Sequence, residues 1–331
     1  MLARFPKIQL AHLPTPLHRL ESFGSKIGHE SLFIKRDDLT GLATGGNKTR
    51  KLEFLLGEAR RVDADVILTE GGVQSNHCRQ TAAACAQLGW ESVLVLNGDE
   101  PEVYQGNLLL GHMAGARMFF AGPVDGEARS RALHAEAERL EEAGRRPFVI
   151  PSGGSTPLGA LGYFDATLEM IRQADAQGLE IRHVIVCGGG GGTAAGVVAA
   201  AALLGKPFVL HVIAIEERVA EMEQTIQELA AGALRLLDIS PAVSPHDVFT
   251  LYDGYLGEGY GVPTAAGLKN IADLATAEGI FLDPVYTGKT MAGLVDLVAR
   301  GIIPASEPAV FWHTGGTTSL FAWPELFQPR R

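Results

Sequence analysis

The segment His183-Val184-Ile185-Val186-Cys187-Gly188-Gly189-Gly190-Gly191-Gly192-Thr193 gives the clearest indication of the fold. Its first five residues form a short apolar run typical of a buried strand. The small residues from Thr193 to Leu204 predict a helix, and a second strand is predicted over 208–215. A strand, a glycine turn, a helix and another strand make the βαβ unit of a parallel sheet.

The glycine run between this strand and this helix also predicts a phosphate-binding loop over residues 188–193. Glycine lets the backbone approach a phosphate closely, several N–H groups can converge on it, and the helix N-terminus adds its dipole. The alternative is a flexible turn. Each glycine adds an entropic cost to folding, so five in succession are an unfavourable choice for a turn alone.

The rest of the chain alternates between strands and helices in the same way, which predicts an α/β protein with a largely parallel sheet. Strands are predicted over 32–34, 66–69, 93–96, 118–120, 148–150 and 309–313. Helices are predicted over 48–62, 80–88, 107–114, 127–143, 158–177, 264–278 and 288–300, and a loop over 238–249. The Pro-, Gly- and Ser-rich segment 151–157 is the predicted domain junction.

Composition narrows the classes of partner. The chain has 331 residues and a net charge of −10 without a run of like charges, which argues against nucleic acid and anionic membrane surfaces. No signal-peptide pattern is present, and the most apolar stretch, 197–204, is too short to span a bilayer, so we expect a cytoplasmic protein. The cysteines Cys78, Cys85 and Cys187 lack metal-ligand spacing, so we expect free thiols and no metal site.

A lysine is the second candidate for chemistry. In Thr44-Gly45-Gly46-Asn47-Lys48-Thr49-Arg50 it follows a glycine pair and begins a helical pattern. The helix N-terminus disfavours an ammonium group, and a lysine with a lowered pKa can form a Schiff base with an aldehyde. The alternative is an ordinary turn with a solvated amine. The charges of residues 35–38 are expected to be a paired, solvated cluster at a strand end.

Two other classes of protein remain open on these residues alone. The glycine run can be matched to Gly-x-Gly-x-x-Gly from Gly188 or Gly190, and Glu216-Glu217 lie where an acidic residue would hold a ribose, as in dinucleotide-dependent oxidoreductases. A non-catalytic protein that binds a phosphorylated small molecule would also need the loop. Both alternatives leave Lys48 without a role.

Five motifs, in order along the chain, carry a resemblance to a known family: 45–53 (Gly-Gly-Asn-Lys-x-Arg-Lys-Leu-Glu), 74–77 (Gln-Ser-Asn-His), 259–263 (Gly-Tyr-Gly-Val-Pro), 283–289 (Asp-Pro-Val-Tyr-Thr-Gly-Lys) and 313–316 (His-Thr-Gly-Gly). The chain resembles the D-cysteine desulfhydrase and 1-aminocyclopropane-1-carboxylate deaminase family, and is also similar to L-cysteate sulfo-lyase. These are pyridoxal-phosphate enzymes of the tryptophan-synthase-β fold type. The resemblance implies two open, largely parallel twisted sheets flanked by helices. It divides the chain into a large cofactor domain (1–50 and 160–331) and a small domain (51–159) that closes over the site.

The resemblance also implies roles for individual residues. Lys48 matches the lysine that holds the cofactor as a Schiff base, and Asn76 the residue that binds the pyridoxal ring hydroxyl. Catalytic roles fall on Lys48, Tyr286, Tyr260 and Ser75; cofactor contacts on Asn76, Gly189, Gly190, Gly191, Gly192, Thr193, Thr287 and Thr314; and substrate contacts on Ser75, Asn76, His77, Tyr260, Tyr286, Thr314 and Gly315. A nearby lysine is expected to lower the pKa of the tyrosines. The family usually mixes serine and alanine into the glycine loop, so this chain lacks those hydroxyl donors.

Two threonines bear on the reaction. In the deaminase branch a glutamate pairs with the pyridine nitrogen and a leucine follows the final-strand histidine, whereas this chain has Thr287 and Thr314. A hydroxyl leaves the ring largely unprotonated, which suits β-elimination better than opening a cyclopropane. The resemblance therefore implies a lyase that acts on a small amino acid. D-cysteine is the expected substrate, with L-cysteate and then 1-aminocyclopropane-1-carboxylate as alternatives, and a homodimer is expected as in relatives.

Overall fold

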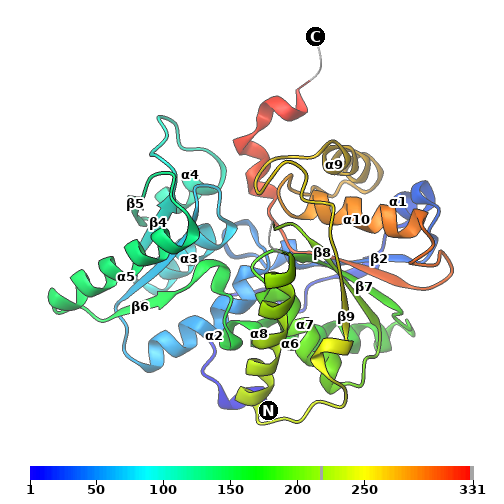
Figure 1. The fold of residues 1–331 in the computed structure, drawn as a ribbon, viewed down its shortest axis with the longest axis horizontal. Helices are drawn as coiled ribbons and strands as arrows, with labels where there is room; N and C mark the ends of the chain where they lie inside the picture. Colours follow the sequence, from blue (N-terminus) through cyan, green and yellow to red (C-terminus); the bar gives the residue numbers. More distant parts are fainter. Residues whose placement is uncertain (217–218, 329–331) are drawn as a thin grey trace.

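The computed structural model describes residues 1–216 and 219–328, which form two separate sheets flanked by helices (Figure 1). The larger sheet has six strands in the order β1-β2-β10-β7-β8-β9, and the smaller has four in the order β5-β4-β3-β6. Only the β1–β2 pair is antiparallel among the strands of the described residues. The predicted fold class is confirmed.

The strands of the larger sheet come from both ends of the chain: Leu17–Arg19 (β1), Leu32–Arg36 (β2), His183–Gly188 (β7), Val209–Ala214 (β8), Phe249–Tyr252 (β9) and Ala309–His313 (β10). The strands of the smaller sheet are Val66–Gly72 (β3), Glu91–Asn97 (β4), Arg117–Phe120 (β5) and Pro147–Ile150 (β6). The α-helices are Glu21–Ile27 (α1), Lys48–Arg61 (α2), Asn76–Leu88 (α3), Gly106–Met113 (α4), Gly126–Glu142 (α5), Pro157–Ala176 (α6), Gly192–Leu203 (α7), Val219–Leu237 (α8), Ala265–Glu278 (α9) and Thr287–Ala299 (α10).

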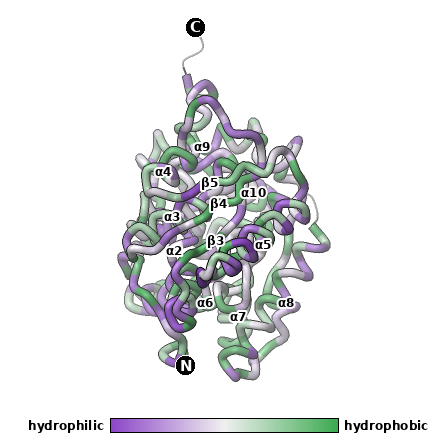
Figure 2. The backbone as a smooth tube through the Cα atoms, turned by 90° about the vertical axis from the view of Figure 1, so that its left-hand side faces the viewer, coloured by the Kyte–Doolittle hydropathy of each residue, from purple (hydrophilic) through white to green (hydrophobic). Residues whose placement is uncertain are grey.

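Helices cover both faces of the larger sheet because its central strands are apolar on both sides. Val184 and Val186 of β7 pack in one core with α6, α7 and α8, whereas Ile185 packs in a second core with α1, α9 and α10. In Figure 1 these two helix layers lie below and above the sheet. Figure 2 shows the smaller sheet from its own side, with α3 and α5 on either side of β3.

Most predicted elements lie within a few residues of the observed ones, but β1, α1, α8 and β9 were not predicted. Helix α8 was missed although Met222, Ile226, Ala230 and Ala233 have helical spacing and are all buried. Strand β9 was missed because it has only four residues and follows a predicted loop. The division into a large domain and a small domain that closes remains a prediction.

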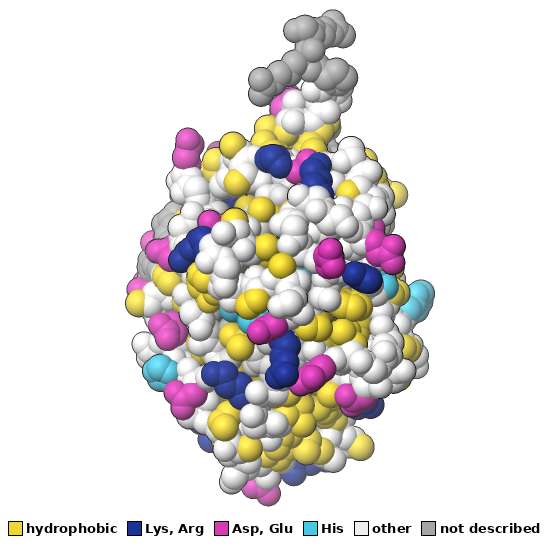
Figure 3. Space-filling view, turned by 90° about the vertical axis from the view of Figure 1, so that its right-hand side faces the viewer, with side chains coloured by type: hydrophobic (Ala, Val, Ile, Leu, Met, Phe, Trp, Pro, Cys, Tyr) yellow, Lys and Arg dark blue, Asp and Glu magenta, His cyan; other side chains and the backbone are white. Residues whose placement is uncertain are grey.

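The surface shows no separation of charge by sign on the face drawn in Figure 3, where basic and acidic side chains are interspersed. No helix in the described part of the chain is both long and apolar enough to cross a membrane. All three cysteines are free and buried, as expected.

The charged segment at the end of β2 is paired, but the expectation that it is solvated is wrong. Asp37 is fully buried and accepts hydrogen bonds from Arg50 Nε and Nη2, each at 2.9 Å. Glu169 Oε1 accepts from Arg50 Nη2 at 2.8 Å and from Lys35 Nζ at 2.6 Å, and the Tyr163 hydroxyl donates to Asp37 at 2.6 Å. This group (Lys35, Asp37, Arg50, Tyr163 and Glu169), called the Asp37 cluster below, joins β2, α2 and α6.

The charges of the Asp37 cluster stabilise one another against the cost of burial. Burial alone would raise the pKa of Asp37, but the charge of Arg50, its hydrogen bonds and the charge of Lys35 outweigh that effect and hold the pKa at about 2. The ionised carboxylate is therefore maintained across the neutral range. Because the pKa lies below the ordinary value of 3.8, folding is favoured by this group above pH 3.8, and the benefit disappears as the pH falls towards 2.

We predict that Asp37→Asn lowers the free energy of unfolding by about 3 kcal/mol at neutral pH, because Arg50 loses its bidentate partner inside the protein. The loss of stability between pH 4 and pH 2 should also shrink by about 2 kcal/mol, since that part depends on protonation of Asp37. Urea unfolding followed by circular dichroism measures both. Glu58→Gln, which removes the exposed Glu58–Arg61 pair, is the control and should cost less than about 1 kcal/mol. Equal effects of the two substitutions would contradict the prediction.

Candidate active site

A cavity of about 690 Å³ lies between the two sheets. Its walls come from loops that follow the carboxyl ends of strands: Ser75–His77 after β3, Gly189–Thr193 after β7, Glu216 after β8 and Thr314–Gly315 after β10. Parallel strands bring their carboxyl ends to one edge of a sheet, which is where open α/β sheets bind ligands. The topology therefore gathers residues that are up to 240 positions apart in the sequence (Ser75 and Gly315).

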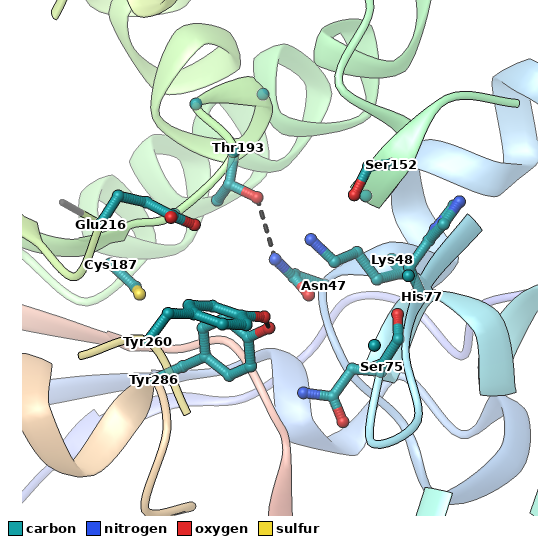
Figure 4. A pocket seen from close by; sticks show the side chains of 18 of the residues that line it. Asn47, Lys48, Ser75, His77, Ser152, Cys187, Thr193, Glu216, Tyr260 and Tyr286 are labelled. Atoms are coloured by element: carbon teal, nitrogen blue, oxygen red, sulfur yellow. Dashed lines mark hydrogen bonds between the residues drawn. The ribbon is translucent and has the colours of Figure 1, made fainter. Parts of the chain in front are cut away.

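Lys48 is the first residue of α2, as predicted, and its side chain reaches into the middle of the cavity (Figure 4). The preceding Gly45 and Gly46 have φ angles of 78° and 131°. A Cβ atom at Gly45 would lie 1.9 Å from the Asp38 carbonyl oxygen, so no larger residue fits the approach to the helix. Burial lowers the pKa of Lys48, which favours the neutral, nucleophilic amine.

Lys51 places a second amine in the cavity, and the sequence analysis did not identify it. It is 1% exposed, and its Nζ donates to the Gly153 carbonyl oxygen at 3.2 Å. Burial, followed by the charge of Lys48, holds the pKa of Lys51 well below its usual range. The available signal was its spacing, because residues three apart on a helix share a face. No carboxylate of the described residues forms an ion pair with Lys51, so an anionic ligand would stabilise its charged form.

The glycine run forms a cradle at the start of α7, which begins at Gly192. A Cβ atom at Gly192 would lie 2.9 Å from Lys51 Nζ and 3.0 Å from Ser155 Oγ, and one at Gly190 would lie 3.2 Å from Ser155 Oγ. The Ser155 hydroxyl is buried without a hydrogen-bond partner among the described residues. Gly190 and Gly192 thus leave room for the side chains that approach the loop. Lys51 and Ser155 supply the side-chain hydrogen-bond donors that glycine lacks.

Thr193 completes the cradle and is tied to the lysine segment. The Asn47 side-chain amide donates to Thr193 Oγ1 at 2.9 Å, which is the bond drawn in Figure 4. Asn47 immediately precedes Lys48, so the cradle and the lysine are held at a constant separation. Both residues line the cavity.

Ser75, Asn76 and His77 come together at the N-terminus of α3, on the cavity wall. Ser75 caps the helix, and its Oγ accepts from the Cys78 N–H at 3.2 Å. His77 is 1% exposed, and both of its ring nitrogens lack a partner among the described residues. Burial, and then the charges of Lys48 and Lys51, keep the pKa of His77 well below its usual value, so the ring is neutral.

Tyr260 and Tyr286 face Lys48 from the opposite wall, with their hydroxyl groups hydrogen-bonded to each other (Figure 4). The expectation that a lysine lowers their pKa values is wrong. Burial of the hydroxyl is the main cause that raises the pKa of Tyr260 to about 12, and burial together with Tyr260 raises that of Tyr286 further. Both phenols are therefore protonated at neutral pH and can serve as proton donors.

The two threonines assigned to the cofactor lie in different places. Thr314 and Gly315 line the cavity. Thr287 is fully buried outside the cavity wall, and its hydroxyl donates to Asp283 Oδ1 at 2.6 Å. Asp283 also accepts from the backbone N–H of Tyr286 at 2.8 Å, so this group fixes the turn that presents Tyr286. Of the two, Thr314 is the one placed to meet a ligand.

Cys187 lines the cavity, but burial raises its pKa to about 12, and burial raises that of Cys78 to about 11, so neither is a thiolate. Glu216 lies on the cavity wall, and Glu217 lies outside the described residues. Within 1–216 and 219–328 no group of three or more His, Cys, Asp or Glu could hold a metal ion.

A buried neutral lysine beside a glycine cradle and a second buried amine defines an enzyme that can bind an aldehyde bearing a phosphate. This donor set fits pyridoxal phosphate. The chain belongs to the family described as pyridoxal-phosphate dependent enzyme, whose model matches residues 8–315. Pyridoxal phosphate is accordingly its cofactor, which excludes the dinucleotide and non-catalytic alternatives.

Known relatives are similar to this chain over nearly its whole length. It is 40% identical to the D-cysteine desulfhydrase of Klebsiella pneumoniae (strain 342) over 327 residues, 97% of each chain. It is also 40% identical to that of Salmonella typhi over 328 residues, again 97% of each. A crystal structure described as an ACC deaminase homologue has a TM-score of 0.91 and 38% identity, and covers 98% of this chain and 97% of that one. Threonine deaminase isoform 2 from Solanum lycopersicum shares the fold, with a TM-score of 0.67 at 18% identity over 96% of this chain and 84% of that one.

We predict that Gly192→Ala raises the dissociation constant of pyridoxal phosphate about tenfold, because the added methyl group collides with Lys51 and Ser155. Gly189→Ala is the matched control, since its Cβ atom would meet no atom closer than 3.8 Å. Titration of the cofactor-free protein, followed by absorbance, measures both constants. A Gly192→Ala protein that binds as tightly as the control would show that the cradle does not hold the phosphate.

Proposed function

We propose that the enzyme catalyses β-elimination on D-cysteine and releases pyruvate, ammonia and hydrogen sulfide with the uptake of one water molecule. The observation that carries this proposal is the buried amine of Lys48, which faces the protonated Tyr260–Tyr286 pair across the cavity. A base and an acid on opposite walls suit removal of one proton and protonation of a leaving group. The relatives named D-cysteine desulfhydrase, 40% identical, support this choice of substrate.

The protein contributes to the reaction by positioning the cofactor and the substrate. Bound pyridoxal phosphate supplies an electron sink that acidifies the Cα–H bond of an attached amino acid. Lys48 would attach the cofactor. Its phosphate would rest on the Gly189–Thr193 cradle, with Lys51 and Ser155 as further donors. Threonine carries no charge, so neither Thr287, which the resemblance assigns to the ring nitrogen, nor Thr314 could supply a counter-charge there, which favours elimination over reactions that need a fully protonated ring.

Substrate binding and proton transfer follow from the side chains. The N-terminus of α3 offers the substrate carboxylate the Ser75–His77 segment and the helix dipole. Lys48 Nζ takes the Cα proton once substrate has displaced it. Tyr286 then protonates the departing sulfur, because its raised pKa keeps the hydroxyl protonated at neutral pH.

We predict that Lys48→Ala lowers pyruvate release from D-cysteine by about 10³-fold or more, since it removes both the attachment point and the base. A coupled lactate dehydrogenase assay measures pyruvate. Lys26→Ala, an exposed lysine paired with Asp273, should leave the rate unchanged. Near-normal pyruvate release by folded Lys48→Ala protein would overturn the proposed function.

We predict that Tyr286→Phe slows turnover of D-cysteine about 10²-fold but slows that of β-chloroalanine much less, because chloride departs without a proton. The comparison of kcat for the two substrates isolates the proton donor from general damage to the site. Tyr255→Phe, whose hydroxyl donates to Asp296, is the control. An equal loss on both substrates would assign Tyr286 a role other than protonation of the leaving group.

The same assay ranks the alternative substrates. L-cysteate and 1-aminocyclopropane-1-carboxylate should be turned over more slowly than D-cysteine. If either reacts faster, that compound replaces D-cysteine as the proposed substrate.

We also propose that the enzyme is a cytoplasmic homodimer. Free, buried Cys78, Cys85 and Cys187 support a reducing compartment, and light scattering of the purified protein would give the assembly.

A further inference from the structure

The amide of Asn76 has only one orientation that its neighbours allow. Asn107 Nδ2 lies 2.9 Å from the Gln74 carbonyl oxygen, which can only accept, so this atom of Asn107 is the nitrogen. The same nitrogen lies 2.9 Å from the Asn76 side chain, so the Asn76 atom it meets is the oxygen. The series of hydrogen bonds from Gln74 through Asn107 to Asn76 therefore determines the orientation of both side-chain amides from donor and acceptor chemistry alone.

Arg79 reaches the same oxygen independently. Its Nη2 lies 3.4 Å from Asn76 Oδ1, and a guanidinium can only donate. With Oδ1 held by two donors, the Asn76 nitrogen is turned the other way. Asn76 lines the cavity, and its Nδ2 has no partner among the described residues without being sealed from solvent. The amide therefore presents N–H donors to whatever occupies the cavity.

Arg79 is itself unusual, because it is 1% exposed yet none of the carboxylates in the described part of the chain pairs with it. The other acceptors of its hydrogen bonds are also neutral: the Ala43 carbonyl oxygen, Thr44 Oγ1 at 2.9 Å and the Gly45 carbonyl oxygen at 3.1 Å. Burial lowers its pKa to about 10. A buried charge with only neutral partners is costly, so an anion arriving next to Asn76 would be strongly stabilised.

We propose that Arg79 and Asn107 are positioning residues that lock the Asn76 amide as a donor, so that Asn76 and the charge behind it hold an anionic oxygen of the bound ligand. Two such oxygens can enter this cavity: the ring oxygen of the cofactor and the carboxylate of the substrate. The inference rests on the cofactor and the geometry of the cavity, and not on the choice of D-cysteine as substrate.

The test uses Asn107→Asp in the full-length, cofactor-loaded protein. A carboxyl group of the same shape cannot donate to both Gln74 and Asn76, so the Asn76 amide should rotate and turn its oxygen to the cavity. The substrate-free enzyme should then lose the visible absorbance band, which requires an anionic ring oxygen, in favour of the near-ultraviolet band. We expect the ratio of the two to fall about tenfold at constant pH, the effect of a lost hydrogen bond to a charged group.

A second readout separates the two oxygens. D-alanine has a carboxylate but no leaving group, and its apparent dissociation constant can be measured by spectral titration. A change in the absorbance ratio assigns Asn76 to the ring oxygen, and a tenfold weaker binding of D-alanine with an unchanged ratio assigns it to the carboxylate. Asn107→Asp protein that folds and matches the wild type within about twofold in both readouts would overturn the proposal.

Two further substitutions control for charge and for damage. Arg79→Lys keeps the cation and should stay closer to the wild type in both readouts than Arg79→Met; equal effects would show that the charge is not involved. Asn270→Asp makes the same change at another buried asparagine, whose amide donates to Ala266 on α9, and should leave both readouts unaltered. Because neither readout uses D-cysteine, failure here is distinguishable from failure of the proposed substrate.

Discussion

The contact between Asp37 and Arg50 is the constraint on which the arrangement of the catalytic lysine depends. Arg50 lies two residues after Lys48, and Asp37 lies at the end of β2, so their bidentate pair fixes the first turn of α2 against the larger sheet. The Asp37 carbonyl oxygen also accepts from the Gly46 N–H at 3.0 Å. Helix α6 closes the arrangement, because a Cβ atom at Gly162 would lie 2.4 Å from the Arg50 carbonyl oxygen. The larger sheet, α2 and α6 thus form one base for the site.

Above this base, the cavity holds basic side chains whose burial favours their uncharged forms. Lys48, Lys51 and His77 all have pKa values lowered first by burial, and the charges of the lysines depress His77 further. A dianionic phosphate is the natural complement of such a cavity, since each added anion relieves the cost of burying these groups. The same logic explains why the protein tolerates Arg79 without a carboxylate partner. The burial that favours the uncharged form of Lys51 also means that an anionic ligand would stabilise its charged form.

The sequence was informative where a property is local. Glycine runs, helical spacing and the position of Lys48 after Gly45-Gly46 depend on neighbours in the chain, and the structure places these features as expected. Burial of Asp37 was not foreseen, because Tyr163, which donates to it, lies on α6, far along the sequence. Ser155 was missed for the same reason, because its hydroxyl reaches the cradle only when the segment after β6 packs against it, whereas Lys51 had a local signal in its spacing of three residues from Lys48. The raised pKa values of Tyr260 and Tyr286 depend on burial, which spacing alone does not reveal.

The segment that leaves the smaller sheet, residues 151–155, has a consequence for mechanics. It supplies the Gly153 carbonyl oxygen that receives Lys51 and the Ser155 hydroxyl that abuts the glycine cradle of the larger sheet. The chain thus crosses between the sheets at the very place where a phosphate would be held. A phosphate bound there would contact the larger sheet's glycine loop and lie beside the segment that leaves the smaller sheet, so cofactor binding would restrain the motion of one sheet relative to the other.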